Sequence, residues 1–152
     1  MVDETNAALG IALLHVHGDE AGILRRIQNE LFDLGADLST PLDGRNAEGA
    51  LRITQAQIDR LEKEIDDWNE DLSPLTSFVL PGGTAASSYL HLARTVCRRA
   101  EGLAVTASRD YAINPLALMY LNRLSDHLFV LGRRLNDGGD GDILWQPGAS
   151  RN

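Results

Sequence analysis

Two arginines and a glutamate lie at helical spacing in the segment ARTVCRRAEGLAV, residues 93–105. Arg94, Arg98 and Glu101 are separated by four and three residues, which places them on one face of a helix. Two solvated arginines one turn apart repel each other by about 0.2–0.5 kcal/mol, whereas carboxylates or phosphates reverse the sign because both fit the guanidinium fork. The row therefore predicts either a binding face for an anion or a solvated basic patch, and its spacing fits both.

A second polar pair follows in YLNRLSDHLF, where Asn122 and Asp126 are four residues apart. Both positions lie beside the leucine seam of one helix, so we expect them to be partly buried where neighbouring helices meet. Buried polar groups need hydrogen-bond partners. If the two helices pack side by side, Asn122 and Asp126 can face the arginine row and form a polar cleft. A purely structural buried network would leave the same pattern.

The stretch FVLPGGT comes directly before the arginine-bearing helix. Gly82 and Gly83 allow backbone amides to point toward an anion at a helix N-terminus. A tight turn is the commoner use of such a pair, and the stretch lacks the lysine and spacing of a P-loop, so no nucleotide site is inferred from it. We also expect no transition-metal site, because the histidines are scattered. They are His15, His17, His91 and His127.

Apolar residues recur at helical spacing in five segments, and no sustained two-residue alternation indicates a sheet. Five helices with short connections predict an all-α fold, a five-helix antiparallel bundle. Residues 39–50 are expected to form a surface loop, and Trp145 in the irregular tail is expected to pack against the body. The first predicted helix covers about residues 3–16, and residues 17–19 separate it from a second helix with a possible stop at Gly35. The third starts at Thr54 with a capping box, the fourth runs from its N-cap Thr84 to about residue 107, and the fifth runs from its N-cap Asn114 to a stop at Gly138 and Gly139.

Each of the last four predicted helices has an apolar stripe that we expect to face the core. The fourth is of particular interest because its stripe must differ from the arginine row. The stripes are Ile23, Leu24, Ile27, Leu31 and Leu34; Ile58, Leu61, Ile65 and Trp68; Val96, Ala100, Leu103 and Ala104; and Leu121, Leu124, Leu128, Leu131 and Leu135.

The composition, with 43% hydrophobic residues and a net charge of −8 over 152 residues, favours one globular domain covering residues 1–152. With 14 Lys and Arg against 22 Asp and Glu, general affinity for nucleic acid or an anionic membrane is not expected. Cys97 is the only cysteine, which indicates a core residue and fits a reducing, cytoplasmic setting. No secretory leader and no apolar run of about 18 residues is present, so we expect a soluble protein.

Six stretches in one order carry a family resemblance: VDETNAALG, IQNELFDLGADLSTP, FVLPGGT, ARTVCRRAE, YLNRLSDHLFVLGRRLN and ILWQPG. Together they span Val2 to Gly148, and they resemble the ATP:cob(I)alamin adenosyltransferases of the propanediol-utilisation type. The resemblance implies a five-helix bundle that forms a homotrimer, with active sites between subunits. It also implies the activity: the 5′-deoxyadenosyl group of ATP moves to the cobalt of cob(I)alamin, giving adenosylcobalamin and triphosphate.

The resemblance assigns a role to each candidate residue of the nucleotide site. Arg98 is expected to contact the ATP phosphates and to act in catalysis, and Glu101 and Asn122 are expected to line the same site. Mg²⁺ is expected to accompany ATP, and the arginine and the ion together would hold the triphosphate.

The resemblance assigns the remaining candidates to the corrin and to the subunit interface. Phe78 is expected at the lower face of the corrin, where an apolar ring excludes water and an axial ligand from cobalt. Asp126 is expected in the same polar cleft. Arg94 is expected to form a salt bridge across the subunit interface with Asp3 of the VDE motif.

Members of the family carry a segment rich in glycine and threonine ahead of the VDE motif, and it wraps the ATP phosphates. Met1 stands where the chain should already enter its first helix, so we expect the nucleotide site to lack one wall. A noncatalytic bundle that binds cobalamin or ATP therefore stays open beside adenosyl transfer, and a purely structural oligomerisation module is the third alternative. A cobalamin reductase or a cobalamin-dependent acceptor enzyme is the expected protein partner.

Overall fold

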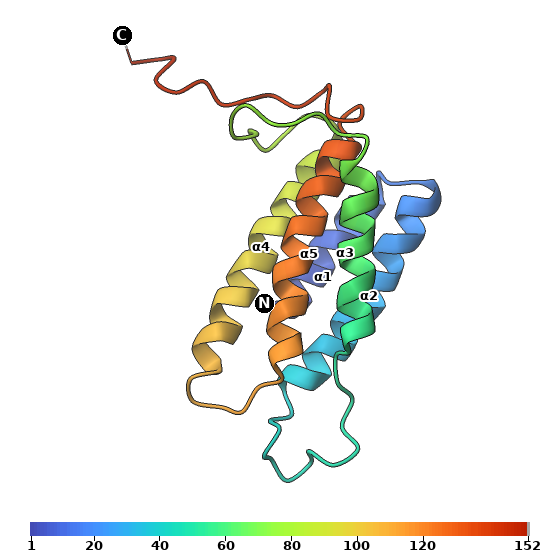
Figure 1. The fold of residues 1–152 in the computed structure, drawn as a ribbon, viewed down its shortest axis with the longest axis vertical. Coiled ribbons are helices and arrows are strands. Elements are labelled where there is room, and N and C mark those ends of the chain that lie inside the picture. The colour runs from blue at the N-terminus through green and yellow to red at the C-terminus, as the bar shows by residue number, and fades with distance from the viewer. Residues whose placement is uncertain (152) are drawn as a thin grey trace.

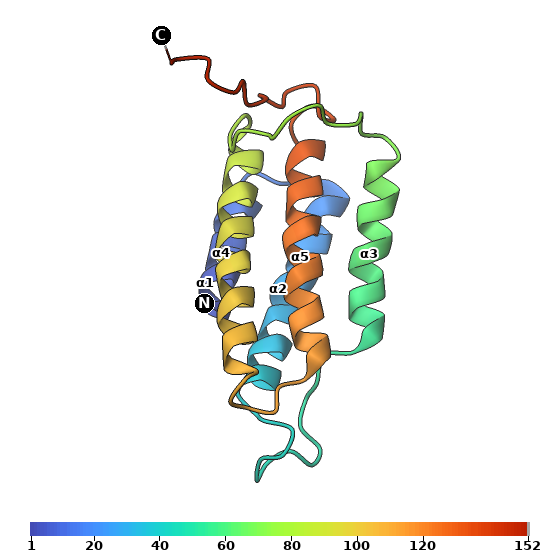
Figure 2. The same cartoon turned by 60° about the vertical axis from the view of Figure 1, so that its left-hand side comes forward.

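The computed structural model describes residues 1–151, which form a bundle of five helices. They are α1 (Val2–Leu13), α2 (Gly18–Leu38), α3 (Gln55–Asn69), α4 (Ala85–Ala107) and α5 (Pro115–Arg134). Consecutive helices run in opposite directions, and α4, α5 and α3 form one layer in front of α1 and α2 (Figure 1, Figure 2). The predicted all-α antiparallel bundle is confirmed. None of the helices in residues 1–151 is long and apolar enough to cross a membrane.

The predicted starts of three helices are confirmed by their caps. Thr54 and Gln57 form the capping box of α3, in which the Thr54 amide donates to the Gln57 side chain at 2.9 Å. The Thr84 hydroxyl accepts a hydrogen bond from the Ser87 amide at 3.1 Å, and the Asn114 side chain accepts one at 3.1 Å from an amide in the first turn of α5. Each cap satisfies an amide that the helix itself leaves unpaired.

Gly35 does not end α2, which continues to Leu38. A glycine stops a helix when it adopts a left-handed conformation, and Gly35 keeps a negative φ. The end of the helix is instead marked by Ser39, whose hydroxyl donates to the Gly35 carbonyl at 2.8 Å. The expected stop was therefore wrong by one turn.

The first and last helices are shorter than predicted. After Leu13 the chain continues to residue 16 in tight turns with bonds between residues three apart, such as the His15 amide to the Ala12 carbonyl at 2.9 Å. At the other end, α5 stops at Arg134, before the glycines that were expected to end it. Asp137 already has a left-handed φ of 56°, so the turn begins before Gly138.

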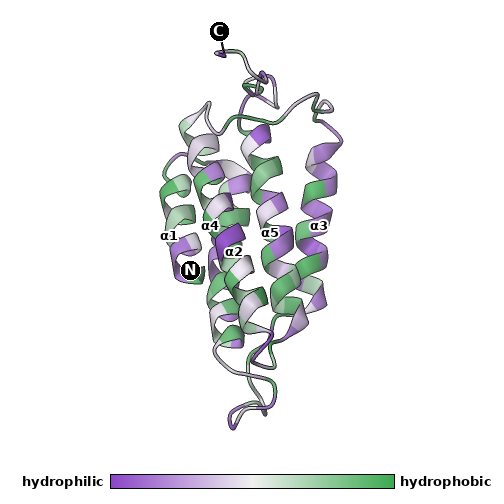
Figure 3. Cartoon of the chain, turned by 90° about the vertical axis from the view of Figure 1, so that its left-hand side faces the viewer, coloured by the Kyte–Doolittle hydropathy of each residue, from purple (hydrophilic) through white to green (hydrophobic). Residues whose placement is uncertain are grey.

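The core lies where the apolar stripes of the helices meet. The stripe residues of α2, α3 and α5 are buried, apart from Ile23, Ile65 and Leu135, which are partly buried. Figure 3 shows hydrophilic and hydrophobic residues alternating along α3, as expected for a helix at the edge of the layer with one buried face. In α4 the prediction was wrong at one position: Leu103 is 53% exposed, whereas its neighbour Ala104 is buried. Adjacent residues of a helix point about 100° apart, so Ala104 faces the core while Leu103 faces outward.

A buried polar network joins α3 to α2 and α5. Arg26 donates to both carboxylate oxygens of Glu64, at 2.9 and 2.6 Å, and the His127 Nε2 lies 3.2 Å from the same carboxylate. The Tyr120 hydroxyl donates to the buried Glu30 at 2.7 Å. Burial alone would raise the pKa of Glu64, but the hydrogen bonds from His127 and Arg26 outweigh it and lower the pKa to about 2. Glu64 therefore stays ionised and holds α3 in place.

Candidate functional site

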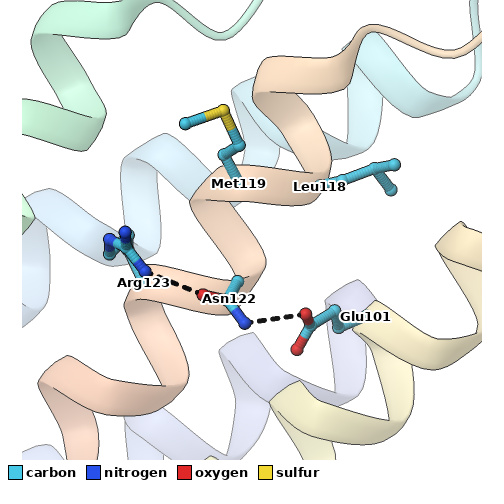
Figure 4. Close-up of a pocket in the computed structure, with 5 residues that line it drawn as sticks. All are labelled: Glu101, Leu118, Met119, Asn122 and Arg123. Atoms are coloured by element: carbon cyan, nitrogen blue, oxygen red, sulfur yellow. Dashed lines mark hydrogen bonds between the residues drawn. The ribbon is translucent and has the colours of Figure 1, made fainter.

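Glu101 of α4 and Asn122 of α5 meet at the front of the bundle. The Asn122 amide nitrogen donates to Glu101 Oε1 at 3.0 Å, and both residues are half-buried (Figure 4). They line a pocket of about 260 Å³ together with Leu118, Met119 and Arg123. The predicted proximity of these two residues is confirmed, and it follows from the short connection between two antiparallel helices. The pocket presents an acceptor and an amide beside apolar side chains.

The polar contacts continue from Asn122 to the next helix. Arg123 Nη1 donates to the Asn122 side-chain oxygen at 2.9 Å, and Arg123 Nε donates to Glu62 Oε1 of α3 at 2.7 Å. The hydrogen bond with Glu62 raises the pKa of Arg123. Neither Arg123 nor Glu62 was predicted as a site residue from the sequence. The only local signal was a cation next to Asn122, and its partner is 61 residues away in the chain.

Arg94 and Arg98 lie on α4 seven and three residues before Glu101, and neither lines this pocket. Arg94 is half-buried, and its Nε has no hydrogen-bond partner within residues 1–151. Burial lowers the pKa of Arg94, and the charge of Arg98 lowers it further. Arg98 is exposed and forms no ion pair in the described part of the chain, whereas its neighbour Arg99 pairs with Glu4 of α1. Two cations without a carboxylate thus share one side of α4, as an anion-binding face requires.

Asp126 does not join this row. It is exposed and lines a separate depression of about 330 Å³, on the side of α3, with Glu62, Ile65, Asp66 and Arg123. The residues on either side of it along α5 turn toward the core and are buried, which leaves Asp126 facing outward. The expectation that Asp126 is partly buried is therefore wrong, and the structure shows no bond between it and either arginine.

Phe78 and Arg94 line a second, larger cavity of about 670 Å³. Phe78 is 77% exposed, so its ring lines the cavity and is not packed in the core. Phe129 and Trp145 contribute two further rings; the Phe129 centroid lies 6.0 Å from Arg94 Cζ, and the Trp145 centroid lies 5.9 Å from that of Phe78. The cavity is aromatic with one cation, which suits a large, flat, mostly apolar ligand.

A short backbone pairing holds the Phe78 segment against the C-terminal tail. The Trp145 amide donates to the Phe78 carbonyl at 2.8 Å, and the Leu80 amide donates to the Ile143 carbonyl at 2.8 Å. Trp145 was expected to pack against the body, but its ring contacts Phe78 in the loop before α4, and 45% of the residue is exposed. Its place in the cavity was missed, because a pairing between residues so far apart leaves no local pattern.

The two glycines before α4 form a structural turn. The Asn136 side chain fills it: its oxygen accepts from the Thr84 amide at 2.9 Å, and its nitrogen donates to the Gly82 carbonyl at 3.0 Å. A Cβ at Gly83 would lie 2.1 Å from the Asn136 oxygen, and Gly83 has a φ of 102°. The Thr84 amide is therefore already satisfied within the chain, which supports the tight-turn interpretation.

Asp3 lies on the exposed side of α1. It lines a depression with Asn6, Ala7, Gln28 and Phe32, and it forms no ion pair within residues 1–151. Asp3 and Arg94 are thus not paired inside one chain. Both remain available for a partner outside it.

The molecule is a five-helix bundle in which α4 and α5 contribute both to a polar pocket at Glu101 and Asn122 and to an aromatic cavity at Arg94 and Phe129, and comparisons with known proteins specify its class. The family model described as "Cobalamin adenosyltransferase" matches residues 1–135. A corrinoid adenosyltransferase of Mycobacterium tuberculosis is 52% identical over 98% of this chain and 78% of the relative. A cobalamin adenosyltransferase of Cupriavidus metallidurans is 41% identical over 95% of this chain and 77% of the relative.

The structural comparison agrees. A variant of a PduO-type ATP:corrinoid adenosyltransferase from Lactobacillus reuteri, complexed with cobalamin and ATP, superposes with a TM-score of 0.87 at 35% identity and covers 96% of this chain and 80% of that one. Another variant of that enzyme, complexed with ATP, gives a TM-score of 0.86. The chain belongs to the cobalamin adenosyltransferase family.

Proposed function

We propose that this protein transfers the 5′-deoxyadenosyl group of ATP to cob(I)alamin. The observation that carries the proposal is the family match over residues 1–135. Two features of the structure support it: the pocket at Glu101 and Asn122, and the aromatic cavity at Phe78 and Arg94. Because α4 contributes to both, the two substrates can meet at this helix.

In this proposal Arg98, Glu101 and Asn122 bind the nucleotide. The exposed Arg98 guanidinium has no partner in the described chain, so it is free to pair with phosphate oxygens. Cobalt attacks the 5′ carbon of ATP, the carbon–cobalt bond forms, and the bond from this carbon to oxygen breaks with its electron pair leaving on triphosphate. Arg98 stabilises the charge that grows on the leaving group, and the pocket holds the ribose in line.

Mg²⁺ fits the residues at the nucleotide site. Mg²⁺ prefers oxygen ligands and is commonly held by one or two carboxylates together with substrate phosphates. Glu101 is the carboxylate of this pocket, and we propose that it holds the ion with the phosphates of ATP. Residues 1–151 contain no cluster of three acidic, histidine or cysteine side chains placed to hold a metal by themselves. When bound, Mg²⁺ neutralises phosphate charge.

We place the corrin in the aromatic cavity, with Phe78 at its lower face. Reduced cobalamin is itself a strong nucleophile, so this chain needs to supply exclusion of water and alignment, not acid or base chemistry. The rings of Phe78, Phe129 and Trp145 provide an apolar surface, and none of the three rings can act as an axial ligand for cobalt. Such a surface favours four-coordinate cobalt, which is easier to reduce. A contact between Asp126 and the corrin stays a prediction, because Asp126 lines the depression on the side of α3 and not this cavity.

A homotrimer is the proposed assembly, with Asp3 of one subunit paired to Arg94 of the next. The absence of an ion pair for either residue within residues 1–151, and the unpartnered Arg94 Nε, support it. A cytoplasmic location and a cobalamin reductase or acceptor enzyme as partner stay predictions. Cys97 is fully buried and its pKa is raised to about 12 by burial, as expected for a core thiol.

An anaerobic assay tests the function. Protein is mixed with reduced cobalamin, ATP and Mg²⁺, and the loss of cob(I)alamin absorption is followed together with triphosphate release. Turnover with one triphosphate released per adenosylcobalamin formed supports the enzyme. Binding of both ligands without turnover would instead identify a noncatalytic carrier or sensor. If neither ligand raises the melting temperature, the bundle is a structural module.

A further inference from the structure

A chain of four hydrogen-bonded side chains crosses the front layer of the bundle. It starts at Glu62 on α3, passes through Arg123 and Asn122 on α5, and ends at Glu101 on α4, with successive distances of 2.7, 2.9 and 3.0 Å. The last two links are drawn in Figure 4. Glu62 itself lies outside the nucleotide pocket and lines the depression on the other side of Arg123. This series of hydrogen bonds therefore connects the pocket to Glu62, which does not line it.

The chemistry of the four groups allows only one direction of donation. A guanidinium has donors and no acceptor, and a carboxylate has acceptors and no donor. The Asn122 side-chain amide lies between the guanidinium and the carboxylate, and it has both an acceptor, its oxygen, and a donor, its nitrogen. Its oxygen must face Arg123 and its nitrogen must face Glu101, because a flipped amide would set oxygen against carboxylate and nitrogen against guanidinium. Arg123 thus fixes which group of Asn122 points toward Glu101.

We propose that Arg123 and Glu62 are positioning residues of the nucleotide site. Glu62 holds the Arg123 guanidinium in place, and Arg123 fixes the orientation of the Asn122 side-chain amide, which we call the amide lock. The amide in turn orients the Glu101 carboxylate that lines the pocket. This inference rests on the proposed function. It extends the site to α3, a helix that contributes no residue to the pocket wall.

The geometry favours a positioning role over a contribution to stability. The side chains of Arg123 and Glu62 are 39% and 41% exposed. An ion pair this open to solvent stabilises a fold only slightly, since water screens it and two long side chains lose freedom. Loss of the pair should therefore affect the pocket more than the bundle.

The main competing role for Arg123 is direct contact with the triphosphate. The effect of removing the Glu62 carboxylate on ATP binding distinguishes the two roles. If Arg123 binds phosphate, Glu62 competes with the nucleotide, and its removal frees the arginine and improves ATP binding. If Arg123 positions Asn122, removal of Glu62 loosens the lock and weakens ATP binding.

Steady-state kinetics of Glu62→Gln, Arg123→Met and their combination test the proposal. We expect the KM for ATP to rise about 3- to 10-fold in Glu62→Gln and about 10-fold or more in Arg123→Met, as for lost charge-assisted hydrogen bonds. The KM for cob(I)alamin should stay unchanged, and the double variant should match Arg123→Met alone, because Glu62 acts only through Arg123. A lower KM for ATP in Glu62→Gln, or additive effects in the double variant, would overturn the proposal.

Asp67→Asn is the matched control. It also removes a carboxylate from an ion pair on α3, that of Asp67 with Lys63 at 2.6 Å, but both side chains are largely exposed and neither lines the pocket. The control should leave both KM values and the unfolding midpoint unchanged. An equal rise in the KM for ATP would mean that the charge of α3 acts generally, and it would contradict the proposed lock.

A measurement without catalysis separates this inference from the proposed function. In nuclear magnetic resonance spectra, the side-chain amide signals of Asn122 should exchange slowly in the unmodified protein and at least several-fold faster in Arg123→Met. Unchanged exchange would overturn the lock whatever the activity. If the unmodified protein transfers no adenosyl group, the proposed function fails, and the exchange measurement still decides whether Arg123 fixes the amide.

Discussion

The ring of Phe78 lies 5.9 Å from that of Trp145, at a tilt of 46°. The two residues are brought together by the hydrogen bond between the Trp145 amide and the Phe78 carbonyl, which joins the segment before α4 to the C-terminal tail. The aromatic cavity therefore has a wall made from two segments that are distant in sequence. Its shape depends on their pairing as well as on the helices.

Phe78→Ala should slow adenosyl transfer much more than it weakens ATP binding. The residue is 77% exposed, so removal of its ring leaves no buried void and should cost the fold little, about 0.5 kcal/mol or less. In the proposed mechanism the ring keeps water from cobalt, and its loss should lower kcat at least about tenfold. Stopped-flow assays and calorimetric titration with ATP measure the two effects. Equal losses in both would contradict the proposed role.

Arg98→Ala should weaken ATP binding and leave the stability of the fold nearly unchanged. Arg98 is exposed and has no ion pair in the described chain, so the free energy of unfolding should change by no more than about 0.5 kcal/mol. Its removal also relieves the repulsion on Arg94. The KM for ATP should rise at least about tenfold, because a charge-assisted contact with phosphate is lost. Arg109→Ala, an exposed arginine beyond the end of α4, is the control and should leave both quantities unchanged.

The sequence predicted the helices and their caps, because these depend on local spacing and on single residues such as Thr84 and Asn114. It also predicted the meeting of Glu101 and Asn122, since a short connection forces α4 and α5 to be neighbours. It did not predict partners between distant helices. Periodicity places Glu62 on a charged face of α3, but the pairing with Arg123 depends on how α3 docks.

For Asp126 the sequence predicted partial burial in a polar cleft, and the structure does not show it. Four-residue spacing from Asn122 suggested a shared polar cleft, but a small rotation of α5 decides which of two such residues is buried. The large aliphatic side chains of Leu124 and Leu128 fix that rotation, because both must enter the core. Asp126 is left facing outward on the side of α3. Packing, which periodicity does not specify, sets the final orientation.

Arg94→Ala should weaken the proposed trimer. The residue is half-buried with an unpartnered Nε, and Asp3 forms no pair within residues 1–151. If the two residues pair between subunits, Asp3→Asn should shift the trimer toward monomer to a similar extent, and the double variant should be no worse than Arg94→Ala. Sedimentation velocity over a range of protein concentrations measures this. A trimer that stays unchanged in Arg94→Ala, with full activity, would refute the pairing. Asp19→Asn, on an exposed part of α2, is the control.

Acid should weaken the attachment of α3 through Glu64. Hydrogen bonds from His127 and Arg26 outweigh the effect of burial and lower the pKa of Glu64 from 4.5 to about 2. Because the pKa is lower in the folded state, the stabilisation is complete above pH 4.5 and is lost as the pH falls toward 2. The shift corresponds to about 3 kcal/mol, and the Glu64 side chain is only 14% exposed, so screening reduces it little.

Urea unfolding at several pH values tests this account. Glu64→Gln should be less stable than the unmodified protein near neutral pH, because Arg26 is left with a weaker partner. The difference should shrink between pH 4.5 and 2, since protonation removes the same charge from the unmodified protein. Glu48→Gln, at an exposed loop position without an ion pair, should have the same free energy of unfolding as the unmodified protein at every pH. A Glu64→Gln deficit that stays constant down to pH 2 would show that its charge does not hold α3.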